Sequence, residues 1–433
     1  MVKHSEMSRR GFARSASVGA ASALFLGSVF QQAPAASTKR RPKIAFLGTD
    51  VFEHSHAQHF LDRFSIGYAM NGHWREPLVE MASVYIEQFN ERDIGKQRIK
   101  KYGLSQYETI AEALTLGGSK LAVDGVILIG EHGNYPRNEK GQKLYPRYKW
   151  FKEIVKVYED SGKAVPVFND KHLSTDWKEC QEMVADSKRL GFAFYAGSSL
   201  PVTWRLPSFD LPFGTPMRES VCVAYGGVDS YDFHALETAQ CMSERRAGGE
   251  VGIASVHAAK GEKLWKMLEE RQDTSQLFVS ALCRSHSLPV ETGYPTAPVT
   301  LEWAKQVLPN TTGYFIEHLD GFKTATFLTG IRDFNYAGLT KSGEVVGCQM
   351  MLPMPGRNAT TADFFNPLSR HVEEMVVAGE TIYPVERTLL TSGMVIGGVE
   401  SLYAGETLWK TDEMAVKYQG PEQSMFWPTE RSS

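Results

Sequence analysis

The chain has 433 residues, 42% of them hydrophobic and 22% charged, which is typical of a soluble globular protein with two domains of ordinary size. Its formal charge is −3, and the first 36 residues hold four of the 47 basic and one of the 50 acidic residues, so 43 basic and 49 acidic residues remain beyond them. This acidic balance argues against nucleic acid or an anionic membrane as the main partner, because both attract basic surfaces.

The first 36 residues predict an export signal. Ser8-Arg9-Arg10-Gly11-Phe12 has the twin-arginine pattern, and a mildly apolar run at 16–30 and small residues at 33–36 follow it. The run is too short and too rich in Ser, Gly and Ala for a membrane span of about 20 apolar residues. We therefore expect a twin-arginine signal peptide over 1–36, a linker at 37–41, and a periplasmic mature protein without a membrane span.

Alternating strand and helix patterns run from residue 42 to 200. The predicted strands are at 44–47, 79–86, 123–129, 164–168 and 192–196, and the predicted helices are at 55–68, 93–102, 107–114, 148–158 and 177–190. Regular alternation of this kind implies a parallel, doubly wound sheet with right-handed crossovers. The fold class is therefore α/β, with a nucleotide-binding type of domain over 42–200.

A second pattern begins after residue 200 and predicts an α+β domain over 201–410, followed by a tail at 411–433. A proline-rich extended segment comes first, and four strands at 314–318, 322–329, 333–339 and 345–351 are expected to form an antiparallel meander. Further helices are predicted at 232–246, 262–271, 367–378 and 386–403, with a strand at 251–258. Five scattered cysteines without C-x-x-C spacing predict buried free thiols, not a zinc site or a disulfide framework.

The stretch Gly162-Lys-Ala-Val-Pro-Val-Phe-Asn-Asp-Lys-His-Leu-Ser174 contains the first candidate site. A buried strand runs into a polar turn with Asp170, Lys171 and His172, and Ser174 is expected to cap the helix that follows. Open α/β sheets bind their ligands at the carboxyl ends of the strands. This turn is therefore the predicted centre of the site.

Several stretches, taken in order, resemble the Gfo/Idh/MocA family of NAD(P)-dependent oxidoreductases. The segment 124–130 resembles the family's fourth strand, 162–174 resembles its "GK-V-EKPLA" segment, 229–237 resembles "D-x-G-x-H-x-x-D", and 371–403 resembles its last segment. The likeness covers most of residues 42–410. It implies a Rossmann-like domain joined to a domain with a mostly antiparallel sheet, NAD or NADP as cofactor, a sugar-like or polyol substrate, and assembly with further copies of the chain.

The resemblance also implies roles for particular residues. Lys171 and His234 match the family's catalytic lysine and histidine, and Asp229 or Asp232 could orient the histidine. The residues expected to contact the cofactor are Gly48, Thr49, Ser55, His56, Glu87, Gly130, His132 and Asp170, and those expected to contact the substrate are His172, Trp204 and Arg205. No metal ligand is implied.

The first turn departs from the family pattern. G-x-G-x-x-G is replaced by a turn with one glycine, Gly48, and two acids, Asp50 and Glu53, which would repel a diphosphate unless they are turned away. A phosphate could still bind the amides at the start of the helix near Ser55 and His56. The family's catalytic aspartate corresponds to Ser230 here.

Two alternatives stay open at this point. The missing glycines favour a non-catalytic periplasmic protein that binds carbohydrate, or acts as a scaffold, on the same fold. The cluster of His54, His56 and His59 could bind a divalent metal together with His132 or His172, which would suit a metal-dependent hydrolase or lyase.

Overall fold

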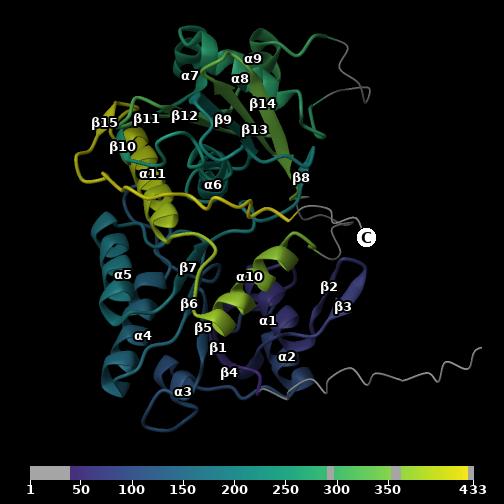
Figure 1. Cartoon of the computed structure of the whole chain (residues 1–433), viewed down its shortest axis with the longest axis vertical. Coiled ribbons are helices and arrows are strands. Elements are labelled where there is room, and N and C mark those ends of the chain that lie inside the picture. Colours follow the sequence, from purple (N-terminus) through teal and green to yellow (C-terminus); the bar gives the residue numbers. More distant parts are fainter. Residues whose placement is uncertain (1–39, 290–296, 353–361, 428–433) are drawn as a thin grey trace, which may run out of the picture. The chain divides into compact units, whose positions relative to one another are not determined.

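A computed structural model describes residues 40–289, 297–352 and 362–427 of the chain (Figure 1). The predicted signal peptide, residues 1–36, lies outside these ranges. Within them, no helix combines the length and the apolar character that crossing a bilayer requires.

A parallel sheet forms the first half of the described chain. Its order is β4-β1-β5-β6-β7, with every neighbouring pair parallel, and its strands are β1 (Lys43–Asp50), β4 (Glu80–Gln88), β5 (Gly125–Ile129), β6 (Val167–Asp170) and β7 (Phe194–Gly197). Side chains of β1 alternate between two hydrophobic clusters, with Ile44 and Phe46 in one and Ala45 and Leu47 in the other. The sheet is therefore covered on both faces, as the α/β prediction requires.

Helices from separate parts of the chain cover these faces. Side chains of α1 (His56–Ile66) and α10 (Phe365–Ala378) pack in the first cluster, and those of α3 (Ile110–Thr115), α4 (Arg147–Ser161) and α5 (Trp177–Leu190) pack in the second. The short α2 (Gly95–Tyr102) contacts α1. The predicted doubly wound domain is confirmed.

Two local predictions in this domain are wrong. The first helix ends at Ile66, since Gly67 has a φ of 89°, and the next residues form a hairpin of β2 (Tyr68–Met70) and β3 (His73–Arg75). The N-cap of α5 is Asp176, whose carboxylate accepts a hydrogen bond from the amide of Glu179 at 3.0 Å. Ser174 instead donates its hydroxyl proton to the Glu179 carboxylate.

The second sheet has eight strands in the order β15-β10-β11-β12-β9-β13-β14-β8. These are β8 (Arg205–Leu206), β9 (Met217–Tyr225), β10 (Ile253–Lys260), β11 (Thr312–His318), β12 (Lys323–Thr329), β13 (Phe334–Thr340), β14 (Val345–Met350) and β15 (Trp409–Lys410). The predicted meander is wrong, because β9 lies between β12 and β13 and is parallel to β12. The neighbours of a strand depend on how the whole sheet packs, so the order of strands in the sequence does not predict them.

Both faces of this second sheet are also covered. Along β9, Cys222 and Ala224 belong to the cluster shared with α6 (Asp232–Ser243), while Val221 and Val223 belong to the cluster of α7 (Gly261–Glu269), α8 (Gln272–Leu282) and α9 (Leu301–Val307). The sequence patterns did not identify α8, α9 or β9. Three helices of the same chain therefore cover the part of the outer face over β9.

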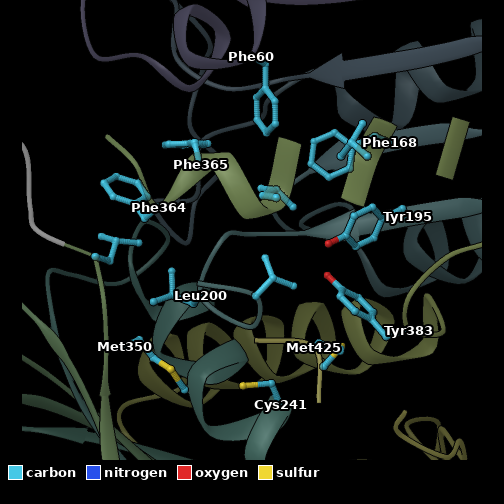
Figure 2. Close-up of a cluster of buried hydrophobic side chains, with 14 of the residues drawn as sticks. Phe60, Phe168, Tyr195, Leu200, Cys241, Met350, Phe364, Phe365, Tyr383 and Met425 are labelled. Carbon is cyan, nitrogen blue, oxygen red and sulfur yellow. The ribbon is translucent and has the colours of Figure 1, made fainter. Parts of the chain in front are cut away.

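One hydrophobic cluster joins the two halves. Figure 2 shows Phe60 and Phe168 of the parallel-sheet half in the same cluster as Cys241 and Met350 of the second half, with Phe365 on the side of Phe60. Helix α11 (Glu386–Tyr403) also contacts elements of both halves, namely α5, α6 and β10. All five cysteines are free, and each is buried except Cys283.

Candidate active site

Polar residues from three strand ends meet at the carboxyl edge of the parallel sheet. Glu131 and His132 follow β5, Asp170 and Lys171 lie at the end of β6, and His56 begins α1 just after β1. Carboxyl ends of parallel strands share one edge, so these side chains are close although their positions in the sequence are far apart. We call this set, together with His234, the edge cluster.

Two contacts connect the edge cluster. The ammonium of Lys171 forms an ion pair with Oε1 of Glu131, and both side chains are at most a tenth exposed. Nδ1 of His56 lies 2.8 Å from Oδ2 of Asp170 and 3.3 Å from Oε2 of Glu131. One imidazole therefore lies between two buried carboxylates.

His234 reaches the same cluster from the second half of the chain. It lies in the first turn of α6, and its ring centroid is 6.3 Å from that of His56. Burial, and then the charges of Lys171 and His56, hold the pKa of His234 well below its ordinary value. The imidazole is consequently neutral at pH 7 with one unprotonated nitrogen, and its surroundings make it a weaker base than a free imidazole.

The backbone at this edge is strained. Eight non-glycine residues in the described ranges have a positive φ, and four of them are at the edge: His54 at 67°, His132 at 68°, Lys171 at 68° and Asp229 at 55°. Such a conformation costs about 1–3 kcal/mol for a residue with a side chain, and such strain is concentrated at functional sites. For Lys171, the bond from its amide to the carbonyl of Gly197, 2.9 Å long, helps to hold this geometry.

The two carboxylates differ in their proton affinity. Burial raises the pKa of Glu131, but the charges of His56, Lys171 and His132 outweigh it, so the pKa lies well below its ordinary value. Burial also raises the pKa of Asp170, and there the attraction to His56 is not sufficient to reverse the shift. Two neighbouring acids with unequal proton affinity can hold one proton between them.

A second pair lies directly behind the turn. Nη1 of Arg147 is 3.0 Å from Nε2 of His172, and both side chains are buried. A Cβ at position 130 would come within 2.7 Å of the Arg147 side chain, so Gly130 is needed for the close approach of this arginine. His172 therefore supports the turn through Arg147 and does not face open space.

Glu131 was not predicted as a site residue, and the contact between Arg147 and His172 was not predicted either. The signal for Glu131 was present, because it follows a buried strand at the same edge as Lys171. Its importance depends on the ion pair, which the sequence does not show.

Asp229 and Asp232 bind backbone groups. The carboxylate of Asp229 accepts a hydrogen bond from the amide of Lys143 at 2.7 Å. That of Asp232 accepts from the amide of Asp229 at 2.9 Å and from the hydroxyl of Tyr314 at 3.0 Å. In the described structure neither carboxylate is hydrogen-bonded to His234, so they fix the loop and the start of α6 and do not orient the imidazole directly.

The residues predicted at the first turn adopt a capped helix start. Ser55 is the N-cap of α1, and its hydroxyl oxygen accepts from the amide of Gln58 at 3.1 Å. The hydroxyl of Thr49 donates to the carbonyl of Glu131, which joins the β1 and β5 ends. A Cβ at position 48 would contact the ring of Phe46, and Glu87 accepts from the hydroxyl of Tyr135.

Two predicted substrate residues lie elsewhere. The side chain of Arg205 is fully buried, and its Nη1 pairs with Asp210 at 2.7 Å. It is therefore a structural residue, and the prediction that it contacts substrate is wrong. The carbonyl of Trp204 accepts from the amide of Met351, and the Trp204 side chain does not line the cavity described next.

A cavity of about 50 Å³ lies beside the edge cluster. Its lining includes the rings of His56, His234, Tyr231 and Phe365. A small-molecule site usually has a volume of about 300–1,000 Å³, whereas one water occupies about 30 Å³. In this conformation the cavity has room for one or two waters.

No protein-family model and no curated protein matches this sequence. Solved structures match its fold. GenD2 from gentamicin A biosynthesis, in complex with NAD, matches with a TM-score of 0.53 and 12% identity over 86% of this chain and 97% of that chain. The myo-inositol dehydrogenase of Lactobacillus casei, in complex with NAD(H) and myo-inositol, matches with a TM-score of 0.52 and 9% identity over 86% of this chain and 97% of that chain. The myo-inositol 2-dehydrogenase of Lactobacillus plantarum matches similarly (0.51, 9%, 86% and 100%). At these identities the likeness shows the fold, and the two-part architecture that the resemblance implied is confirmed.

Proposed function

We propose that this chain is an exported oxidoreductase that transfers hydride between NAD(P) and a sugar-like or polyol substrate. The observation that carries the proposal is the edge cluster, in which Lys171 and His234 from the two halves of the chain converge at the ligand-binding edge of the sheet. The fold is shared with dehydrogenases solved with NAD over 86% of the chain. These findings support the reaction class more than any one substrate.

The first turn leaves room for a dinucleotide phosphate despite its acids. The carboxylate of Asp50 is 1% exposed and accepts from the Asn90 amide at 2.9 Å, so its charge is turned inward. The side chain of Glu53 is 81% exposed and extends into solvent. The amides of His56 and Ala57, in the first turn of α1, have no acceptor within the helix, which suits one phosphate. Glu87, near the end of β4, is the residue proposed for a ribose hydroxyl, which would have to share its carboxylate with the hydroxyl of Tyr135.

When bound, NAD(P) would accept a hydride from a substrate carbon. For that reaction the chain must remove the hydroxyl proton and stabilise the negative charge that develops on the substrate oxygen until the hydride leaves. The neutral imidazole of His234 would take the proton, and the Lys171 ammonium would donate a hydrogen bond to the oxygen. The ion pair with Glu131 would hold that ammonium in position.

Binding of substrate requires side chains near the edge cluster to move. The rings of Phe52 and His132 are 4.9 Å apart across the β1 and β5 loops, and Phe365 lines the small cavity. A ring of sugar size does not fit a space of about 50 Å³. This small cavity alone is therefore not large enough for the proposed substrate.

Mass spectrometry of small molecules released by denaturing the purified protein tests the proposal. We expect NAD or NADP from protein prepared without added nucleotide, and reduction of nicotinamide when sugars and inositols are supplied. A Lys171→Ala variant should keep the nucleotide and lose turnover. No released nucleotide, together with stabilisation by sugars alone, would instead select the carbohydrate-binding alternative.

Export by the twin-arginine route is part of the proposal, and it has its own test. It rests on Arg9 and Arg10 and on the apolar run behind them. A chain with both arginines replaced by lysine should stay in the cytoplasm, whereas the unchanged chain should appear shortened in the periplasm. Assembly with further copies is likewise proposed, and light scattering on the purified protein measures it.

A further inference from the structure

We propose that His56, Glu131 and Asp170 form a binding site for a divalent transition-metal ion, Zn²⁺ or Mn²⁺. The site goes beyond the proposed hydride transfer and does not rest on it, because it needs no nucleotide. It also differs from the histidine-only cluster that the sequence suggested, since two of its three ligands are carboxylates.

The positions of the three ligand atoms suit a cation. One ligand atom from each residue lies within 4.8 Å of the others, and the separations from Nδ1 of His56 are 2.8 Å to Asp170 and 3.3 Å to Glu131. Zinc bonds to nitrogen and oxygen are about 2.0–2.2 Å long, so ligands around one ion lie roughly 3–3.5 Å apart. The observed separations from His56 are close to this range, and a small shift would seat the ion.

Atoms without partners provide a second, independent observation. Oε2 of Glu131 and Oδ1 of Asp170 are buried and have no hydrogen-bond donor in the described part of the chain. Glu131 is 7% exposed and Asp170 is fully buried. A buried carboxylate oxygen without a hydrogen bond costs free energy, and a cation bound beside His56 would contact Oε2 of Glu131 directly and Oδ1 of Asp170 if that carboxylate binds through both oxygens.

The residue types narrow the choice of metal. Imidazole with two carboxylates suits Zn²⁺, Mn²⁺ or Fe²⁺ better than Ca²⁺, which prefers oxygen ligands alone. The small cavity lined by His56 and His234 borders one of the three ligands, so a water that completes the coordination would enter from the side of His56. A site of three protein ligands and an open position is the arrangement of catalytic zinc centres.

Two of the three ligands are anionic. Glu131 and Asp170 bring two negative charges when ionised, which oppose the two positive charges of the ion, and the ammonium of Lys171 lies at the other oxygen of Glu131.

Metal analysis of the full chain, purified without chelator or affinity-tag metal, tests the site. We expect close to one Zn or Mn per chain, and Co²⁺ added to chelator-treated protein should give a visible absorption band from the bound ion. The variants His56→Ala and Asp170→Asn should lose the metal and the cobalt band. The matched control is His54→Ala, because His54 is two residues away, lines the same cavity and is not one of the three ligands.

The contrary results are equally definite. Substoichiometric metal with no cobalt band in a folded, chelator-treated protein would overturn the site. Equal metal loss in His54→Ala would also overturn the assignment of the three ligands. Circular dichroism of every variant separates lost binding from lost folding, and nucleotide release is measured separately, so failure of the metal site and failure of the proposed hydride transfer are distinguishable.

Discussion

Two buried ionic clusters of this chain differ in how completely their polar atoms are paired. In the second half, the carboxylate of Glu250 accepts from Arg246 at 2.9 and 3.2 Å, from Gln240 at 2.7 Å and from the backbone amide of Gly252 at 2.9 Å, and Nδ1 of His318 lies 3.0 Å away. In the edge cluster, Glu131, Asp170 and His234 each keep a buried atom without a partner in the described structure. Within the second cluster the Glu250 carboxylate itself is fully paired, and the unpaired buried atom there is Oε1 of Gln240.

This difference in pairing distinguishes a cluster that stabilises the fold from a cluster that can bind a ligand or take part in a reaction. Burial raises the pKa of Glu250, but His318 and Arg246 outweigh it and hold the pKa far below its ordinary value, so its charge is fully paired. A fully paired buried carboxylate contributes to folding and has no capacity left for a ligand. Buried atoms that remain unpaired destabilise the fold, and they are retained where a ligand or a reaction uses them. The predictions below test this distinction.

Lys171→Met should have the largest effect, and the effect should be on catalysis. Loss of the positioned ammonium is expected to lower turnover by about 10²–10⁴-fold, which is the usual contribution of a group that assists proton transfer. The fold should lose stability but survive, because Glu131 loses its ammonium partner and keeps only the imidazole of His56, 3.3 Å away. Steady-state oxidation of inositols and sugars gives the turnover, and urea unfolding gives the stability. If the variant instead loses its fold, and turns over normally once it is stabilised, the role of Lys171 is structural and not catalytic.

Glu250→Ala should have the opposite outcome. Removing the Glu250 carboxylate leaves the buried Arg246 with Asp320 as its remaining charge partner and takes away an acceptor of Gln240, which costs up to about 3–5 kcal/mol of unfolding free energy. Turnover per folded molecule should not change, because Glu250 is not part of the edge cluster. Urea denaturation followed by fluorescence measures the loss. A change below about 1 kcal/mol would show that the pairing carries little stability.

His234→Phe should stabilise the chain slightly while it removes activity. Nδ1 of His234 is buried and unpaired in the described ranges, and an apolar ring removes that cost, which is about 1–3 kcal/mol for a polar group. Crowding against Phe334 and Tyr231 offsets part of the gain, so we expect a net change from zero to about 1 kcal/mol. Thermal unfolding and the turnover assay decide the outcome. A loss of several kcal/mol would show that the imidazole is structural.

Glu237→Gln should change the pH dependence of stability. Burial raises the pKa of Glu237 to about 7, so between its unfolded pKa near 4.5 and pH 7 the folded chain binds more protons than the unfolded chain. Stability should therefore fall as pH rises through this window and stay low above it. Glutamine does not ionise, so its curve should be flatter between about pH 5 and 8. Parallel curves for the two proteins would contradict the raised pKa.

The sequence by itself determined the elements with strong periodicity. The buried runs at 44–47 and 123–129 predicted β1 and β5, and the spacing of apolar residues predicted α5 to the residue. These patterns are local, because a strand buried on both faces or an amphipathic helix requires its apolar residues wherever it packs. The carboxyl edge followed from strand order alone, so Asp170, Lys171 and His56 were identified as candidates before their contacts were known.

Only the tertiary structure decided the pairing of strands and of charges. β9 lies between β12 and β13 although about 100 residues separate it from either, and its partner depends on which edge the folded halves leave available. In the same way, nothing local distinguishes Glu131, which holds Lys171, from Arg205, which pairs with Asp210 inside the core. Ion pairs between distant residues form only once folding has removed both groups from water, so they are a property of the packed chain and not of the sequence pattern.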